Sequence, residues 1–255
     1  MLPRNPDRLG FLVERPFAHR GLHDGETIIE NTAQAFEAAI AGGYGIECDI
    51  VLSADGEAVV FHDSTLERLT QASGRVDALS LQELKAITFR QPSARGFLTL
   101  PELCALVDGR APLLVELKSE WDGNVRLAQE AVKHLRDRPG PIAVMSFDPV
   151  LLAHVRRLAP EMVRGLTACP FTHPFWRARL PGNLRIALQR MEHLEETQPE
   201  FISFDAGALP AWQTSYFRRR GLPVLCWTVR DAATAAWARA YADQITFEGF
   251  LPQTD

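Results

Sequence analysis

Short hydrophobic runs alternate along this chain with longer segments in which apolar residues recur at helical spacing. Residues 16–21 (PFAHRG) and 44–50 (YGIECDI) form the first two runs. Between them, residues 31–43 begin with Asn31 or Thr32 as a candidate N-cap and end in two glycines, which are the start and stop signals of a helix. Six further strand-like runs lie at 111–119, 142–148, 163–169, 200–207, 223–231 and 244–249, and helix-length segments such as 124–137, 149–158 and 231–240 separate most of them.

Eight strands that alternate with helices favour a parallel sheet, and within 255 residues they fit a closed barrel better than an open sheet. We therefore predict an α/β protein with the (β/α)8 TIM-barrel fold, in which residues 1–255 form a single domain.

The regular alternation is interrupted after the second strand. Residues 51–63 (VLSADGEAVVFHD) predict a hairpin with Asp55-Gly56 at its turn. The following segment, 64–100, is too long for a plain connection and contains one predicted helix, 80–87, with Ser80 as its N-cap. We predict that 64–100 is a small inserted subdomain after the hairpin.

The last predicted strand has too little chain after it for a helix, because only six residues follow position 249. A complete eighth helix is therefore not expected. We predict that the first 15 residues cover the gap that it leaves.

Composition narrows the class of protein. The net charge of −5 gives no bulk electrostatic attraction to nucleic acid, and no apolar run reaches the ~18–20 residues that span a bilayer, so neither nucleic acid nor stable membrane insertion is expected. The first residues have no apolar core of signal-peptide length, which favours a cytoplasmic location. The four cysteines, Cys48, Cys104, Cys169 and Cys226, stand singly in apolar stretches and are expected to be buried reduced thiols. The oligomeric state stays open.

Unusual polar residues gather at the ends of the predicted strands, which is where TIM barrels place their active sites. They are His19 and Arg20, Glu47 and Asp49, His62 and Asp63, Glu116 and Lys118, and Trp227. Side chains at positions i and i+2 of a strand share a face, so Glu47 and Asp49 point the same way, and Glu116 and Lys118 do too. A carboxylate inside an apolar barrel is costly unless it is paired or bound to metal.

These residue types indicate a reaction at an anionic group. Glu47, Asp49 and Glu116 offer oxygen ligands that suit one divalent cation, Mg²⁺ or Ca²⁺; the alternative is a set of salt bridges to Arg20 and Lys118. His19 and His62 suit general acid–base work, while Arg20 and Lys118 suit a phosphate. His19 and Arg20 would face opposite sides of a regular strand, and Gly21 permits a backbone break that brings both to the site.

The ordered set of motifs resembles the glycerophosphodiester phosphodiesterase family. The matching pieces are His19-Arg20-Gly21, Glu30-Asn31-Thr32, Glu47-Cys48-Asp49, residues 53–63, residues 65–70 with Gly74, residues 100–103, Glu116-Leu117-Lys118, Ser146-Phe147 and Trp227-Thr228-Val229. No single piece is specific, but together they run in family order over roughly residues 16–250.

The resemblance implies metal ligation by Glu47, Asp49 and Glu116, and acid–base catalysis by His19 and His62 in the hydrolysis of glycerophosphodiesters to glycerol 3-phosphate and an alcohol. Arg20 and Lys118 would bind a small-molecule phosphodiester, and the Trp227 ring would pack against its glycerol or leaving group. Glu30 would order the first loop near the metal. Which histidine is the acid is not decided.

The chain departs from the family pattern at the rim of the site. Arg230 stands where the family often has asparagine, Glu248 follows Thr246-Phe247 where the family often has Thr-Asp, and Ile29 replaces a proline. Residues 170–176 (PFTHPFW) either pack on the barrel rim or meet an acyl chain, and His23, Asp24 and Glu26 either lie in solvent or contact a head group. Two other functions therefore stay open: a lysophospholipase D acting on single-chain lipids, and a phosphodiester-binding protein without turnover.

Overall fold

The computed structural model describes residues 8–92, 94 and 96–253, and its centre is a closed barrel of eight parallel strands. The barrel strands are β1 (Phe17–Ala18), β2 (Gly45–Leu52), β5 (Leu113–Leu117), β6 (Ile142–Ser146), β7 (Val163–Ala168), β8 (Phe201–Asp205), β9 (Val224–Val229) and β10 (Gln244–Phe247). They pair in the order β1, β10, β9, β8, β7, β6, β5, β2, and the pairing of β1 with β2 closes the ring. The predicted TIM barrel is confirmed.

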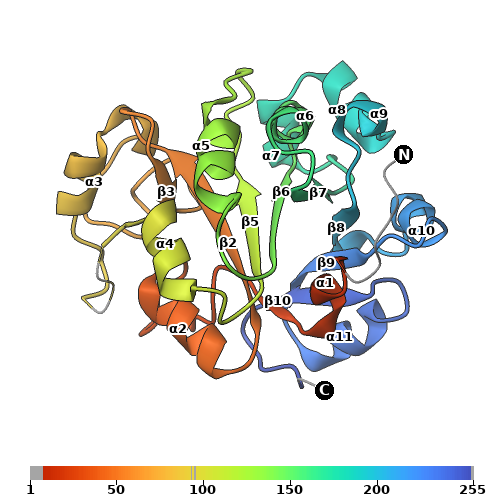
Figure 1. Ribbon diagram of the computed structural model, residues 1–255, viewed down its shortest axis with the longest axis horizontal. Coiled ribbons are helices and arrows are strands. Elements are labelled where there is room, and N and C mark those ends of the chain that lie inside the picture. Colours follow the sequence, from red (N-terminus) through yellow and green to blue (C-terminus); the bar gives the residue numbers. More distant parts are fainter. Residues whose placement is uncertain (1–7, 93, 95, 254–255) are drawn as a thin grey trace.

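Helices surround the strands, and Figure 1 shows them on the outside of the barrel. They are α2 (Ala33–Ala41), α4 (Leu100–Val107), α5 (Arg126–Leu135), α6 (Pro149–Leu158), α7 (Pro174–Arg179), α8 (Gly182–Gln189), α9 (Leu194–Thr197), α10 (Trp212–Arg218) and α11 (Ala232–Ala238), with a short 3-10 turn η3 (Ala206–Ala208). Thr32 caps α2 through its side chain, as predicted. None of the helices in the described ranges has the length and apolar character needed to cross a bilayer.

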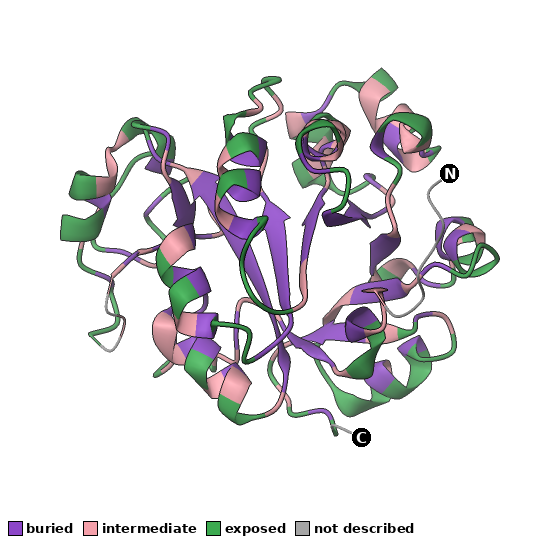
Figure 2. Cartoon of the chain, viewed as in Figure 1, coloured by how far each residue is buried: buried purple, intermediate pink, exposed green. Residues whose placement is uncertain are grey.

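Two phenylalanine rings fill the half of the barrel at the amino-terminal ends of the strands, where neighbouring strands carry glycine. A Cβ on Gly45 would lie 2.7 Å from the ring of Phe17, and one on Gly165 would lie 2.1 Å from the ring of Phe201. Inward-facing aliphatic residues such as Leu114 complete this cluster. Figure 2 shows the strands buried along most of their length. Because apolar side chains fill this amino-terminal half, the polar inward-facing residues gather at the carboxyl ends of the strands. All four cysteines are buried and free, as expected.

The N-terminal segment lies elsewhere than predicted. Helix α1 (Phe11–Glu14) packs Phe11 and Leu12 against the apolar cluster that contains Phe17 and Phe201, so it closes the amino-terminal mouth of the barrel. The prediction that the first 15 residues cover the missing eighth helix is therefore wrong for residues 8–15, and residues 1–7 lie outside the described part. The apolar floor of the barrel gives Leu12 a fully buried site.

The chain after β10 covers its outer side instead. No helix follows β10 among residues 248–253. The ring of Phe250 packs on Phe247 with 5.8 Å between centroids, and the Tyr44 hydroxyl donates a hydrogen bond to the Pro252 carbonyl at 2.8 Å.

The hairpin after β2 and the segment that follows form a separate packed unit beside the barrel (Figure 1). Strand β3 (Ala58–Val60) runs antiparallel to the end of β2, with Gly56 at φ +88° in the turn, and β4 (Leu98–Thr99) pairs with β3. The 3-10 turn η2 (Val76–Ala78) and helix α3 (Leu81–Ala86) lie between them, and Ser80 and Glu83 form a capping box on α3. An apolar cluster distinct from that of the barrel holds the unit together: Ile29, Val51, Val59, Phe61, Leu66, Val76, Leu84, Phe89 and Phe97.

Candidate active site

The polar residues predicted at the strand ends line one cavity at the carboxyl-terminal mouth of the barrel. The cavity has a volume of about 640 Å³. Its lining includes His19, Arg20, Glu47, His62, Glu116, Lys118 and Trp227. Asp49, the remaining predicted residue, lies beneath the surface and is 1 % exposed.

Three buried carboxylates converge at the base of this cavity. Glu47 and Asp49 share the inner face of β2, and Glu116 stands beside Asp49 because β2 and β5 pair with Asp49 opposite Glu116. Glu47 is 1 % exposed and Glu116 is 6 % exposed. One carboxylate oxygen from each residue lies within 4.8 Å of the other two. The alternation of the strands, read from the sequence, brings these side chains together as predicted.

The charge balance among these carboxylates fits a divalent cation. Lys118 Nζ lies 2.9 Å from Asp49 Oδ1 and 2.5 Å from Glu116 Oε1. Burial works to raise the pKa of Asp49, but Lys118 and other nearby cations hold it below its usual range. At Glu47, burial and the nearby Asp49 and Glu116 raise the pKa well above the ordinary value, although the Arg20 backbone N–H and the Lys118 charge act in the opposite direction. Salt bridges from Arg20 and Lys118 to Asp49, the alternative to a metal site, are present. They do not offset the burial of Glu47, so the three carboxylates still fit a cation site built from oxygen ligands.

The first loop turns sharply so that consecutive residues reach the site. Arg20 and Gly21 both have left-handed backbone, with φ of +56° and +80°, and a Cβ on Gly21 would lie 2.8 Å from the carbonyl carbon of Ala35. This break ends β1 at Ala18 and sends the Arg20 side chain to Glu30, with Nη1 2.7 Å from Oε1. The Arg20 backbone N–H donates to Glu47 at 2.9 Å. The predicted break at Gly21 is present, and it includes Arg20.

Asn31 fixes the orientation of Asp49 from the same loop. Its side-chain amide donates to Asp49 Oδ2 at 3.0 Å, and its Oδ1 accepts the Asp49 backbone N–H at 3.3 Å. Asn31 itself has φ of +56° and is buried.

Each of the two predicted acid–base histidines has a carboxylate at its Nδ1 atom. His19 Nδ1 lies 2.5 Å from Glu248 Oε2, and His62 Nδ1 lies 2.7 Å from Asp63 Oδ1. His19 is the more buried of the two, and burial lowers its pKa in spite of the hydrogen bond to Glu248. The Nε2 atom of His19 lies 4.0 Å from Glu47 Oε2.

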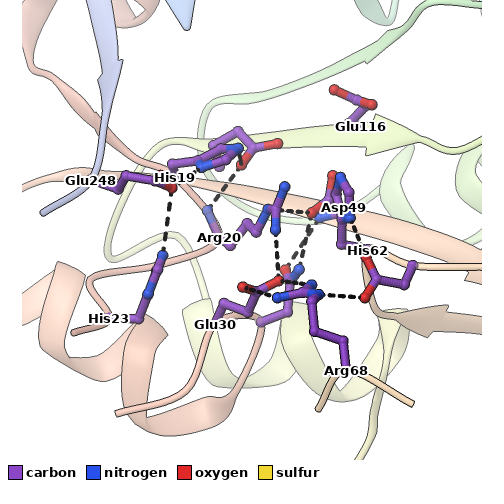
Figure 3. Close-up of polar contacts among 12 residues, drawn as sticks. His19, Arg20, His23, Glu30, Asp49, His62, Arg68, Glu116 and Glu248 are labelled. Atoms are coloured by element: carbon purple, nitrogen blue, oxygen red, sulfur yellow. Dashed lines mark hydrogen bonds and ion pairs between the residues drawn. The ribbon is translucent and has the colours of Figure 1, made fainter. Parts of the chain in front are cut away.

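Arg68 connects the second histidine to the first loop, and sequence reasoning assigned it no role. Its Nε donates to Asp63 Oδ2 at 2.5 Å, and its two terminal nitrogens contact Glu30 at 2.7 and 2.8 Å. Figure 3 shows Glu30 between Arg20 and Arg68. The only sequence signal for this contact was the place of Arg68 in the motif of residues 65–70.

Glu248 and Arg230 also take part in the site, although the sequence marked them only as departures from a family pattern. Glu248 Oε1 accepts from Arg230 Nε at 2.8 Å. His23 Nε2 lies 3.8 Å from Glu248 Oε2, so the His23 side chain packs inward. The Asp24 side chain instead accepts hydrogen bonds from the backbone N–H groups of residues 26–28 and stabilises the turn of its own loop. Burial works to raise the pKa of Glu248, but the hydrogen bonds to His19 and His23 and the nearby charge of Arg230 outweigh burial and lower this pKa.

Aromatic rings form part of the cavity wall. Phe147 lies 4.9 Å from Trp176 and 5.5 Å from Trp227, measured between ring centroids, and Trp121 lies 6.1 Å from Trp176. The Trp227 Nε1–H donates to the Ser203 carbonyl at 3.1 Å, which holds its ring in place. Within residues 170–176, Phe171 packs into the barrel rim, whereas Phe175 is 52 % exposed and lines the cavity.

Known proteins share both this sequence pattern and this architecture. Residues 19–243 match the model of the glycerophosphoryl diester phosphodiesterase family. A glycerophosphodiester phosphodiesterase of Caldanaerobacter subterraneus subsp. tengcongensis is 32 % identical over 171 residues, which cover 63 % of this chain and 70 % of that protein. One from Bacillus altitudinis is 34 % identical over 161 residues, 57 % of this chain and 63 % of the relative.

A phosphodiesterase from Oleispira antarctica, solved in complex with the product sn-glycerol-3-phosphate, has a similar fold. Its TM-score is 0.77 at 24 % identity, and the match covers 94 % of each chain. The family match extends over most of the chain and includes every residue of the site described above except Glu248. The chain therefore belongs to the glycerophosphoryl diester phosphodiesterase family.

Proposed function

We propose that this protein hydrolyses glycerophosphodiesters to glycerol 3-phosphate and an alcohol, with one divalent cation, Mg²⁺ or Ca²⁺, and two histidines. The observation that supports this most strongly is the placement of three buried carboxylates within 4.8 Å of one another in a cavity that two histidines also line. A cytoplasmic location remains a prediction from the sequence.

The cation would be held by Glu47, Asp49 and Glu116, and it would supply positive charge to the phosphodiester oxygens as negative charge builds up in the transition state. Arg20 and Lys118 add fixed cationic groups beside the same oxygens, because both line the cavity next to these carboxylates. The buried Nε of Arg20 lies 3.4 Å from Asp49 Oδ2, so the guanidinium faces the carboxylate cluster beside which the phosphodiester would bind.

The proton transfers are assigned to His19 and His62. One histidine takes a proton from the attacking oxygen, either of water or of the glycerol 2-hydroxyl, as this oxygen bonds to phosphorus. The other gives a proton to the alcohol oxygen as its bond to phosphorus breaks. Attack by the 2-hydroxyl yields a cyclic phosphate that water then opens, so both routes end in the same products. Because Glu248 contacts Nδ1 of His19 and Asp63 contacts Nδ1 of His62, the Nε2 atom of each histidine would carry out these transfers.

The assay that tests this function measures glycerol 3-phosphate released from glycerophosphocholine, with EDTA, Mg²⁺ and Ca²⁺ in parallel. Glu47→Ala is the site variant, and Glu37→Ala, which alters a remote carboxylate paired with Arg110, is the control. Release that depends on the cation and is lost only in Glu47→Ala supports the function. Absence of release from glycerophosphodiesters under every condition contradicts it.

The aromatic wall supports a second candidate, hydrolysis of single-chain lysophospholipids at the same site. Phe147, Phe175 and Trp176 give the cavity an apolar side that an acyl chain would cover. We expect Trp176→Ala to raise KM for lysophosphatidylcholine more than for glycerophosphocholine, while Trp212→Ala, at an exposed position of α10, changes neither. Equal effects of Trp176→Ala on both substrates would count against the acyl-chain role. Tight binding of either compound without product would instead indicate a binding protein.

A further inference from the structure

Three neighbouring strands end at the same level of the barrel, and the residue after each end points toward its neighbours. Ala18 of β1 pairs with Phe247 of β10, and Phe247 pairs with Val229 of β9. The ladder continues for one more residue: the His19 backbone N–H donates to the Phe247 carbonyl at 2.9 Å, and the backbone N–H of residue 248 donates to the Val229 carbonyl at 3.0 Å. Residues 19, 248 and 230 therefore stand side by side on the inner rim.

Their side chains form a chain of contacts in which each carboxylate oxygen has its own partner. Glu248 Oε2 faces His19 Nδ1 at 2.5 Å, and Glu248 Oε1 accepts from Arg230 Nε at 2.8 Å and from Nη2 at 2.7 Å. His23 Nε2, 3.8 Å from Oε2, packs against the same carboxylate, and Figure 3 shows Glu248 between the two histidines. Because an ionised carboxylate only accepts hydrogen bonds, Nδ1 of His19 must carry the proton in this contact.

We propose that Glu248, held in place by Arg230, is the positioning residue for His19. The inference rests on the proposed function of His19 and extends it. Glu248 fixes both the ring orientation and the tautomer, so that the proton stays on Nδ1 and the lone pair of neutral His19 stays on Nε2. Nε2 then faces the carboxylate cluster, 4.0 Å from Glu47.

The other histidine has an independent arrangement of the same type. His62 Nδ1 contacts Asp63 Oδ1 at 2.7 Å, and the second oxygen of Asp63 accepts from Arg68 at 2.5 Å. A histidine, a carboxylate at Nδ1 and an arginine behind it thus occur on both sides of the cavity. This repetition supports a shared role, because the two sets come from different parts of the chain.

The register of β10 explains how Glu248 reaches this position. Between the pairs Ile245–Cys226 and Phe247–Val229, β9 contains one residue more than β10. Phe247 points outward, and its ring packs on the ring of Tyr44 with 4.8 Å between centroids. The next residue, Glu248, is therefore the first after the strand to face inward. Position 248 follows the Thr-Phe pair that stands in place of the Thr-Asp often found in the family, and Arg230 stands in place of an asparagine. The two departures are in direct contact and act as one unit.

The kinetic test compares Glu248→Gln and Arg230→Gln with Glu37→Gln. Glu37 also forms a pair with an arginine, but on the outer face of α2, so its variant should match the wild type. We expect Glu248→Gln to lower kcat and kcat/KM together by roughly 10–100-fold. Arg230→Gln should lose less, because 63 % of its side chain is exposed and solvent screens its charge. In a His19→Ala background, Glu248→Gln should add no further loss, whereas an equal loss in both backgrounds would overturn the positioning role.

A nuclear magnetic resonance measurement tests the same inference without activity. In metal-free wild type, ¹⁵N shifts of His19 should report neutral imidazole with the proton on Nδ1, and a downfield N–H proton should accompany it. Glu248→Gln should remove this proton signal, while Glu37→Gln should keep it. A His19 tautomer that is unchanged in Glu248→Gln overturns the inference even if the enzyme is active, and an inactive wild type with the expected tautomer contradicts the proposed function alone.

Discussion

Replacing Glu47 by glutamine should change how the stability of the metal-free protein depends on pH. Burial and the neighbouring Asp49 and Glu116 raise the pKa of Glu47 well above its ordinary value. The folded protein therefore keeps a proton on this carboxyl at pH values where the unfolded chain has already lost it. For a pKa raised by folding, the stabilisation is fully present below the unfolded value, about 4.3, and is lost as pH rises toward the folded value.

The expected slope follows from one proton. Each pH unit between the two pKa values should remove about 1.4 kcal/mol from the free energy of unfolding of the wild type relative to Glu47→Gln. Over two pH units within that interval the loss amounts to about 2.7 kcal/mol, or roughly 5–11 °C in melting temperature for a domain of this size. Burial also lowers the pKa of His193 to about 4, which makes the stability of both proteins rise with pH, opposite to the effect of Glu47. Subtracting the stability of Glu47→Gln from that of the wild type removes this shared contribution and isolates Glu47.

The assay is chemical denaturation of both proteins in EDTA at half-unit steps of pH, repeated with saturating Mg²⁺ or Ca²⁺. A cation at 100 times its Kd stabilises a protein by about 2.7 kcal/mol, and this gain should appear in the wild type and diminish in Glu47→Gln. Stability curves of the two proteins that run parallel from pH 5 to pH 7 would refute the reasoning about buried like charges.

Three further outcomes are expected. His19→Ala and His62→Ala should each lower kcat by at least ~10²-fold, and near wild-type turnover in either variant would remove that residue from the acid–base pair. Gly165→Ala should destabilise the protein by about 1–3 kcal/mol or more in thermal unfolding, since its Cβ would lie 2.1 Å from the Phe201 ring; an unchanged melting temperature would show that the barrel interior is looser than described. Leu12→Ala should lower the free energy of unfolding by about 2–5 kcal/mol, because Leu12 is fully buried against the barrel floor, and a loss typical of a surface site would contradict that packing.

The barrel strands and the carboxylate cluster could be predicted because both depend on patterns within single strands. Alternation places Glu47 and Asp49 on one face of β2 whatever the rest of the chain does. Helix signals were equally local: the N-caps at Thr32 and Ser80 are present as expected. The N-terminal segment shows the limit of this reasoning, because apolar residues such as Leu12 indicate burial but not the surface against which they are buried.

The contacts that complete the site depend on register between strands and on side-chain reach, which no local pattern reports. Glu248 faces His19 only because β10 pairs with β9 across an irregularity that turns Phe247 outward. Arg68 reaches Glu30 from 38 positions away in the sequence. A departure from a family motif was the only sequence signal at Glu248, and its partner Arg230 was a second departure whose connection to the first required the fold.

One divalent cation shared by Glu47, Asp49 and Glu116 is the claim on which the proposed chemistry depends most. Anomalous diffraction from crystals soaked in Mn²⁺ tests it directly, because the ion marks its own position. We expect a single strong peak among the three carboxylates in the wild type, and its loss in Glu47→Gln. A site without the peak at saturating Mn²⁺, or a peak bound to other residues, would contradict the claim.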